Sequence, residues 1–261
     1  MRCQRCETCF IRDEHRNIEE NGSFPPYRTK RGAKRMNKNI PVVIMAGGKG
    51  ERMRPFSDVL PKPLLLYHGK TLIENVILQF YNKGFRTFYF VLCNQGLLIA
   101  NYLSMIKLDC EMHFVYEEVP MGTVGGLWLM RNELTGSFIL CNCDNLGDFN
   151  YLQAIEFHHM EQAAITMFVK KERYTIPFGL VHTDGKTQVC SVDEKPTLNS
   201  YISTGVYVID STVIRSFLNG VSMDMPTLIN HVLTEAKVCF FDIGDTQWID
   251  MSLGVFTIEK E

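Results

Sequence analysis

The feature that most constrains how this chain can fold is an apolar run, residues 42–46, that leads directly into a glycine-rich loop. The run is partly β-branched, which favours a parallel strand covered on both faces. Gly47, Gly48 and Gly50 follow it, and glycines allow backbone N–H groups to approach an anion closely. A buried strand that ends in such a loop predicts a phosphate-binding site.

Cations accompany this loop in the sequence, and they are Lys49, Arg52, Arg54 and Lys62. Lys62 stands between Pro61 and Pro63, which restrict its backbone. Two rival phosphate-binding signatures do not fit, because a G-x-G-x-x-G motif would need glycine at position 53 and a P-loop would need Ser or Thr at position 50. Glycines together with several cations suit a triphosphate.

The residues after the loop alternate between helical and strand-like patterns. Thr71–Glu74 is a capping box, and apolar residues continue at helical spacing until Gly84. Residues 86–93 and 111–116 are strand-like and enclose a helical stretch over residues 96–105. This alternation predicts an α/β fold with a Rossmann-like, doubly wound sheet that is mainly parallel but mixed.

Further elements are expected in the second half of the chain. They cover residues 137–144 (strand), 151–160 (helix), 163–169 (strand), 203–208 (strand), 211–218 (helix), 225–236 (helix) and 237–242 (strand). An Asp184–Gly185 turn joins the strand-like residues 177–181 and 189–196, which predicts a β-ribbon. A helix is also expected to start within residues 117–126.

The first 39 residues differ from the rest of the chain. They contain few large aliphatic side chains and many basic residues, which predicts a flexible, basic, Cys-containing leader before a single domain over residues 40–261. The residues there that could form a zinc site are Cys3, Cys6, Cys9 and His15. Because structural zinc sites usually take ligands from two separated pairs, we expect a solvated leader with incidental thiols instead.

Composition and charge argue against several classes of partner. The formal net charge is -2, so nothing indicates nucleic acid or a membrane surface as a partner. There is no run of about 18 apolar residues and no apolar segment near the first residue, so we expect neither a spanning helix nor a secretory signal. The nine cysteines are odd in number, which argues against a disulfide framework. The expected location is the cytoplasm.

Several motifs, taken in order over about residues 40–255, resemble those of the sugar-phosphate nucleotidyltransferases. The matching segments are residues 47–53 with Pro-Lys-Pro at 61–63, Glu-Glu-Val-Pro-Met-Gly-Thr at 117–123, Asn-Cys-Asp at 142–144, Glu-Lys-Pro at 194–196, Thr-Gly-Val-Tyr at 204–207 and Trp-Ile-Asp at 248–250. Two positions depart from the family pattern. Glu51 stands where many members have Thr or Ser, and Ser203 stands where Asn is usual. We expect the Glu51 carboxylate either to point away from the triphosphate or to contact a cation.

The resemblance implies roles for the matching residues. The nucleotide would be bound by Ala46, Gly47, Gly48, Gly50, Glu117, Gly122 and Thr123. The sugar would be bound by Gly179, Glu194, Thr204 and Gly205. Arg52 would hold the leaving pyrophosphate, Lys62 the phosphates at the reacting centre and Lys195 the sugar phosphate, so these three are the expected catalytic residues. Asp144 and Asp250 would hold Mg2+, which usually takes only one or two protein carboxylates together with substrate phosphates.

The reaction that the resemblance implies joins an NTP and a sugar 1-phosphate to give an NDP-sugar and pyrophosphate, for surface glycan biosynthesis. Glu117 favours GTP, because a carboxylate offers only acceptors and guanine presents adjacent N1–H and N2 amino donors. A pyrimidine NTP remains an alternative, and glucose, mannose, a heptose and an amino sugar all remain open as the sugar. A homo-oligomer is compatible with the sequence.

Two other classes of function are alternatives. One is a nucleotide-sugar-binding regulatory subunit without catalysis, and the cations and acids that occur together in the chain argue against it. The other is a glycosyltransferase of similar architecture. That class would need an Asp-x-Asp metal motif, and none occurs in this sequence.

Overall fold

The computed structural model describes residues 40–48, 50–51, 54 and 56–251. These residues divide into two compact units. The hairpin unit comprises residues 172–200, and the sheet unit comprises the described residues before and after it. Our expectations for residues 1–39, namely the leader and its cysteines, lie outside the described residues.

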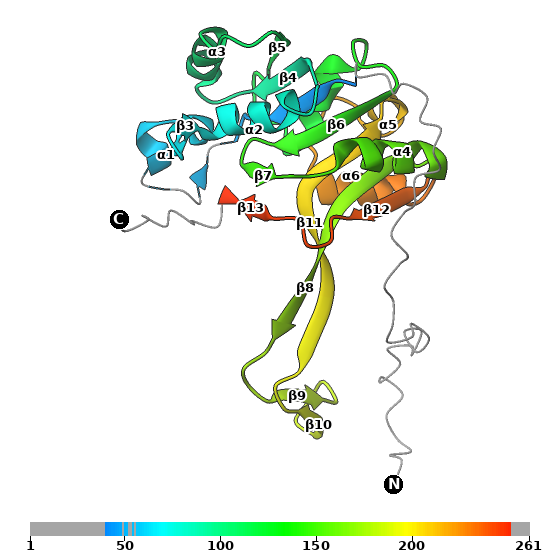
Figure 1. The fold of residues 1–261 in the computed structure, drawn as a ribbon. Coiled ribbons are helices and arrows are strands. Elements are labelled where there is room, and N and C mark those ends of the chain that lie inside the picture. The colour runs from blue at the N-terminus through cyan, green and yellow to red at the C-terminus, as the bar shows by residue number, and fades with distance from the viewer. Residues whose placement is uncertain (1–39, 49, 52–53, 55, 252–261) are drawn as a thin grey trace. The chain divides into compact units, whose positions relative to one another are not determined.

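A seven-stranded sheet in the order β12-β8-β11-β6-β1-β4-β5 forms the centre of the sheet unit (Figure 1). Its strands are β1 (Val42–Met45), β4 (Thr87–Leu92), β5 (Glu111–Tyr116), β6 (Ser137–Asn142), β8 (Ile165–Thr175), β11 (Thr197–Asp210) and β12 (Val238–Asp242). β1 pairs in parallel with β4 and β6, β4 with β5, and β12 with β8, whereas β11 runs antiparallel to β6. The mainly parallel, mixed sheet predicted from the sequence is confirmed.

Helices cover both faces of this sheet. They are α1 (Phe56–Val59), α2 (Leu72–Tyr81), α3 (Gly96–Ser104), α4 (Tyr151–Glu161), α5 (Thr212–Phe217), α6 (Met225–Val232) and the 3-10 helices η2 (Lys62–Leu64) and η3 (Gly125–Met130). On one face, Phe80 of α2 stacks on Tyr151 of α4 with 4.3 Å between ring centroids, and Tyr151 also contacts Phe168 of β8. The next residue towards the start of β8, Met167, packs instead against a different core cluster, which includes residues of α5, α6 and η3. Successive strand residues point to opposite faces, so the doubly wound arrangement is confirmed.

Helix α2 begins where the capping box predicts. Thr71 is its N-cap, and the Oγ1 of Thr71 accepts a hydrogen bond from the backbone N–H of Glu74 at 3.2 Å. The apolar positions of the helix, which recur at helical spacing, are buried, and they are Leu72, Ile73, Val76, Ile77 and Phe80. The helix therefore forms because one end is capped and one face is covered by the sheet.

Several elements differ from the sequence-based expectation. β8 and β11 are several residues longer than predicted. Most of the additional residues are partly or fully exposed, so no apolar pattern in the sequence marks them as strand. The helix expected after Glu117 is the 3-10 helix η3. The sequence also predicts neither of two short antiparallel sheets. These are β2 (Leu66–Tyr67) with β3 (Lys70–Thr71), and β7 (Asn145–Gly147) with β13 (Trp248–Asp250).

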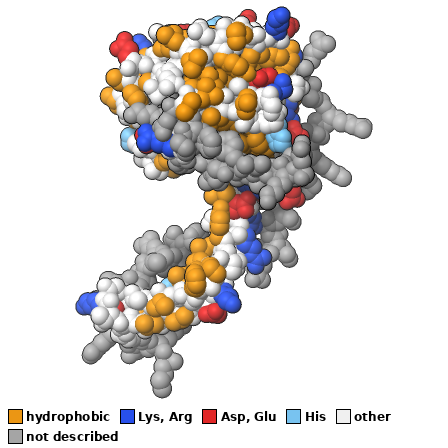
Figure 2. Space-filling view, turned by 90° about the vertical axis from the view of Figure 1, so that its left-hand side faces the viewer, with side chains coloured by type: hydrophobic (Ala, Val, Ile, Leu, Met, Phe, Trp, Pro, Cys, Tyr) orange, Lys and Arg blue, Asp and Glu red, His pale blue; other side chains and the backbone are white. Residues whose placement is uncertain are grey.

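The hairpin unit contains the predicted ribbon. Its strands β9 (Leu180–Thr183) and β10 (Val189–Asp193) pair antiparallel. In the predicted turn between them, the Asp184 carboxylate accepts a hydrogen bond from the backbone N–H of Lys186 at 2.8 Å. Apolar side chains lie at the surface of this unit (Figure 2), and Phe178 is 73% exposed.

Two further expectations concern the chain as a whole. No helix in the described part of the chain combines the length and the apolar character needed to cross a membrane. The cysteines at positions 93, 110, 141, 143, 190 and 239 are not in disulfides.

A buried histidine makes the stability of the sheet unit sensitive to acid. His158 of α4 is 2% exposed, and its Nδ1 lies 2.9 Å from the Oγ1 of Thr166. Burial, reinforced by the neighbouring His159, lowers the pKa of His158 to about 4, and Asp210 opposes this shift. The unfolded chain therefore takes up a proton at a higher pH than the folded chain. Stability from His158 is present above about pH 6.5 and is lost as the pH falls towards 4.

We expect the free energy of unfolding to fall by about 2 kcal/mol between about pH 7 and pH 5 through this residue. Urea denaturation at both pH values measures the difference. His158→Gln should remove most of it, whereas His113→Gln, at an exposed histidine, should leave it unchanged. An unaltered pH dependence in His158→Gln would show that the buried neutral imidazole is not its source.

Candidate functional site

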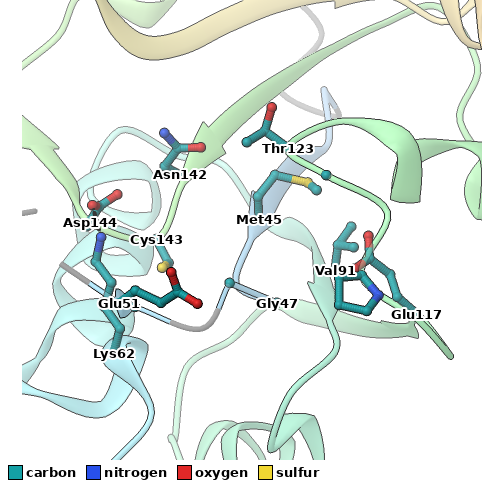
Figure 3. A pocket seen from close by; sticks show the side chains of 14 residues that line it. Met45, Gly47, Glu51, Lys62, Val91, Glu117, Thr123, Asn142, Cys143 and Asp144 are labelled. Carbon is teal, nitrogen blue, oxygen red and sulfur yellow. Dashed lines mark hydrogen bonds and ion pairs between the residues drawn. The ribbon is translucent and has the colours of Figure 1, made fainter. Parts of the chain in front are cut away.

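A cavity of about 530 Å³ lies where β1, β4, β5 and β6 end at their carboxyl termini (Figure 3). Eight of the predicted site residues line it, and they are Gly47, Gly48, Gly50, Lys62, Glu117, Gly122, Thr123 and Asp144. Ligands of open α/β sheets bind at this edge, and small-molecule sites commonly measure about 300–1,000 Å³. The fold therefore gathers most of the predicted nucleotide-binding residues around one cavity.

The glycine loop forms one wall of the cavity. Neighbouring atoms leave too little space for a side chain at the first residue of the loop, so glycine is favoured there. A Cβ at Gly47 would lie only 3.0 Å from the Cβ of Cys93 and 3.4 Å from the Oε2 of Glu117. Ala46, directly before the loop, is buried, and its N–H donates to the carbonyl of Val91 at 2.9 Å. Ala46 thus fixes the start of the loop to strand β4, and it does not line the cavity.

Glu117 places a buried carboxylate on the cavity wall. It is 8% exposed, and its Oε2 accepts a hydrogen bond from the backbone N–H of Met121 at 3.4 Å. Its Oε1 has no hydrogen-bond partner among the described residues. Burial raises the pKa of the Glu117 carboxyl, and the Met121 N–H offsets part of that rise. One oxygen holds the loop, and the other is an acceptor that a ligand can satisfy.

Asp144 and Lys62 form an ion pair on the cavity wall, away from Glu117 (Figure 3). The Nζ of Lys62 donates to the Oδ2 of Asp144. Asp144 follows strand β6 and is 6% exposed, and Lys62 opens η2 between two prolines. Because both side chains are largely withdrawn from solvent, salt screens their attraction less than it would at the surface. The predicted phosphate-binding lysine and the predicted metal-binding aspartate therefore meet.

The fold also brings Asp250 to Asp144, although the two are far apart in the sequence. β13 pairs antiparallel with β7, which sets Asp250 opposite Asn145. The backbone N–H of Met251 donates to the carbonyl of Asp144 at 3.2 Å. The two predicted metal-binding acids thus lie on neighbouring backbones.

These acids suit a hard divalent cation. In the residues that the structure describes, no group of three or more His, Cys, Asp or Glu side chains could hold a metal. Mg2+ does not need one, because it usually binds one or two carboxylates and completes its shell with phosphate oxygens and water. The ammonium already paired with Asp144 shows that this carboxylate accepts a positive charge. The donor set therefore fits Mg2+.

The predicted sugar-binding residues of the sheet unit differ in their surroundings. Thr204 is buried, and its hydroxyl donates to the carbonyl of Phe168 at 3.0 Å, so the hydroxyl is committed to the sheet. A Cβ at Gly205 would lie 2.8 Å from the Nδ2 of Asn142, which itself lines the cavity. Gly205 is therefore next to the cavity wall.

The other predicted residues lie elsewhere in the chain. Gly179, Glu194 and Lys195 belong to the hairpin unit. There the Oε2 of Glu194 would be 3.3 Å from a Cβ at Gly179, so these two residues lie together as expected. Arg52 lies outside the described residues. The roles of Arg52 and of the hairpin residues remain predictions.

Some residues of the cavity were not predicted to be there. Asn142 and Cys143 line it because Asn142 ends strand β6 and Cys143 follows, directly before Asp144, and that position is the signal that could have identified them. Burial raises the pKa of the Cys143 thiol to about 12, which keeps it protonated and makes it a poor nucleophile. Glu51 also lines the cavity (Figure 3), and contact of its carboxylate with a cation stays a prediction.

Comparisons with known proteins agree with this geometry. A sequence model of the family described as "Nucleotidyl transferase" matches residues 41–251. The mannose-1-phosphate guanylyltransferase catalytic subunit beta of Drosophila pseudoobscura pseudoobscura is 27% identical over 188 residues, which are 66% of this chain and 48% of that protein. The UTP–glucose-1-phosphate uridylyltransferase of Synechocystis is 24% identical over 229 residues, which are 80% of this chain and 59% of that protein. The chain spans about half the length of the curated relatives it matches.

Solved structures share the fold. HddC from Yersinia pseudotuberculosis complexed with GMP-PN matches with a TM-score of 0.63 at 19% identity, over 82% of this chain and 94% of that chain. The inositol-1-phosphate CTP transferase from T. maritima matches with a TM-score of 0.61 at 20% identity, over 82% of this chain and 90% of that chain. The family model covers the glycine loop, both acids and the sheet that unites them, and this chain therefore belongs to the nucleotidyl transferase family.

Proposed function

We propose that this chain transfers a nucleoside monophosphate from an NTP, with GTP favoured, to a sugar 1-phosphate. The products would be an NDP-sugar, for surface glycan biosynthesis, and pyrophosphate. The observation that carries the proposal is the single cavity in which the glycine loop, Lys62 and Asp144 meet. Family membership supports the same class of reaction.

The attacking group in this reaction is a phosphate oxygen that is already ionised, so no strong general base is required. The task of the protein is to align two phosphates for in-line attack at the α-phosphorus and to balance the charge that develops. Gly47, Gly48 and Lys62 line the cavity, and the backbone N–H groups of the two glycines and the ammonium of Lys62 are proposed to bind the triphosphate. Arg52 is proposed to bind the leaving pyrophosphate, and Lys195 the attacking sugar phosphate.

Asp144 and Asp250 are proposed to hold the divalent cation. Such an ion, when bound, neutralises phosphate charge and orients the triphosphate. Among the described lining residues, Glu51, Glu117 and Asp144 carry carboxylates and Lys62 alone carries an ammonium. A triphosphate is therefore bound more favourably together with a cation than by itself.

The proposed preference for GTP is based on Glu117. Its Oε1 is a buried acceptor with no partner among the described residues, and guanine offers two adjacent donors. Relatives from Drosophila and from Mycobacterium tuberculosis are mannose-1-phosphate guanylyltransferases, and the Yersinia structure holds GMP-PN, which supports guanine. A relative that is a uridylyltransferase keeps a pyrimidine NTP as the alternative.

Glu117→Gln should reduce the preference for GTP over UTP, measured as the ratio of kcat/KM values, by about 10-fold or more. The substitution replaces one of the two acceptor oxygens with a donor that faces the donors of guanine. Glu118→Gln makes the same chemical change at the next, exposed residue and should leave the ratio unchanged. Equal ratios in Glu117→Gln and the unaltered chain would remove the argument for guanine.

The proposed reaction is tested by incubating the purified chain with Mg2+, each NTP and a panel of sugar 1-phosphates while pyrophosphate is measured. Release that requires both substrates supports the proposal, and the active pair identifies base and sugar. If pyrophosphate is released only when the NTP is a pyrimidine nucleotide, the proposed type of reaction stands, but its nucleotide substrate is not GTP. Binding of NDP-sugars without release from any pair would favour the regulatory binding protein instead.

A further inference from the structure

The ion pair in the cavity places a cation of the protein on a carboxylate that the proposed function assigns to a divalent metal. Lys62 contacts the Oδ2 of Asp144, and the side chains of the two residues are 13% and 8% exposed. This arrangement gives the buried carboxylate a counter-charge in the chain without ligands. An unpaired carboxylate at the same depth would be costly.

The backbone of Lys62 is held firmly, whereas its side chain is flexible and borders the cavity. Pro61 precedes it and the buried Pro63 follows it, and the N–H of Leu65 donates to the carbonyl of Lys62 at 3.1 Å. The stem of the side chain runs beside the glycine loop, because a Cβ at Gly50 would lie 2.9 Å from the Cβ of Lys62 and 3.7 Å from its Cδ. Rotation about the bonds of this flexible stem would move the ammonium away from Asp144 and along the glycine loop, with the backbone unchanged.

An ammonium and a divalent cation repel each other strongly when they contact the same carboxylate. We propose that Lys62 is an internal competitor for the divalent-cation site. Its ammonium holds Asp144 in the chain without ligands, and it leaves Asp144 when nucleotide and metal bind together. The released ammonium then pairs with the phosphates. The inference rests on the proposed function, because that function assigns the metal to Asp144.

This movement of the Lys62 ammonium couples the binding of the divalent cation to the binding of the nucleotide. Without nucleotide, a metal has to displace the ammonium, so the chain binds divalent cations weakly. Phosphates attract the ammonium away from Asp144 and also supply metal ligands, so nucleotide strengthens metal binding. By linkage, the metal strengthens nucleotide binding by the same factor. Lys62 thus favours binding of the nucleotide as its metal complex, in addition to its proposed contact with the phosphates.

The test measures the affinity of the chain for Mn2+ in the absence of nucleotide, with electron paramagnetic resonance as the detection method. Lys62→Met removes the ammonium and keeps an unbranched stem, and we expect it to raise Mn2+ affinity by about 10-fold or more. Lys62→Arg keeps a cation beside Asp144 and should bind Mn2+ as weakly as the unaltered chain. The double variant Lys62→Met, Asp144→Asn should lose the gain, because the carboxylate is absent.

Lys83→Met is the matched control. Lys83 pairs with the exposed Asp148 at 2.5 Å, outside the cavity lining, so its loss removes the same charge without opening Asp144. Mn2+ affinity should be unchanged in this variant. Thermal denaturation verifies folding, and Lys62→Gln gives the same comparison if Lys62→Met does not fold. Equal or weaker Mn2+ binding by a folded, uncharged Lys62 variant would overturn the proposal. No turnover is measured, so this outcome is distinct from failure of the transferase reaction.

Discussion

Asp144→Asn should lower the rate of pyrophosphate release by at least about 100-fold while the protein remains folded. Asn keeps the shape of the side chain but removes the negative charge proposed to hold the divalent cation. Raising the Mg2+ concentration should recover little of the rate, because a neutral amide is a weak ligand for Mg2+. The measurements are initial rates over a range of Mg2+ concentrations, with circular dichroism and Tm to verify folding.

The substitution also removes the partner of Lys62, so we expect some loss of stability in addition. That loss is limited because the ammonium borders the cavity and can turn towards solvent. Asp148→Asn is the matched control, since Asp148 also pairs with a lysine but its side chain is 88% exposed. The control should keep its full rate. A folded Asp144→Asn variant that also keeps its rate would contradict the metal assignment.

Gly122→Ala should destabilise the protein by about 2–4 kcal/mol and weaken nucleotide binding. The φ of Gly122 is +78°, which costs a residue with a side chain about 1 kcal/mol. The added Cβ would also lie 2.5 Å from the carbonyl oxygen of Met223. That obstacle is backbone, so no rotation of a side chain relieves it. Chemical denaturation measures the loss of stability.

A shift at Gly122 reaches the cavity through its neighbours. The N–H of Val124 donates to the carbonyl of Met223 at 3.1 Å, and the N–H of Met225 donates to the Oγ1 of Thr123 at 2.8 Å. Both Gly122 and Thr123 line the cavity, so displacement of this loop reshapes the wall that a nucleotide would contact. We therefore expect a higher Kd for GTP in this variant, which equilibrium binding would detect.

Gly136→Ala is the control that tests backbone strain without steric overlap of the added Cβ. Gly136 has a φ of +68°, but a Cβ there would have nothing within 4 Å. This variant should lose only about 1 kcal/mol and keep its affinity for GTP. Equal losses in the two glycine variants would show that the contact with Met223 is not the cause.

The parts of the fold that could be predicted are those in which a short sequence pattern determines the structure of the same residues. Thr71 caps α2 because a hydroxyl at that position can accept a hydrogen bond from the N–H of Glu74. The place of Asp144 followed from a general rule, since an acid that ends a buried parallel strand lies at the ligand edge of the sheet. The strand order itself is not a local property, but alternating strands and helices restrict it strongly.

The parts that could not be predicted depend on contacts between distant elements. No sequence pattern indicates that the ammonium of Lys62 pairs with Asp144, because ion pairs between different elements leave no periodic signal. The commitment of the Thr204 hydroxyl to Phe168 is likewise a tertiary contact, and the family motif alone assigns that residue to the sugar.

The central claim is that the nucleoside monophosphate, which contains the α-phosphate of the NTP, is transferred to the sugar phosphate. The most direct test uses GTP, and then each other NTP, with radioactive label either at the α-phosphate or at the γ-phosphate, together with Mg2+ and a panel of sugar 1-phosphates. We predict that the α-label appears in an NDP-sugar and the γ-label in pyrophosphate. Transfer of the γ-label to the sugar, or no transfer of α-label from any of the NTPs, would contradict the account.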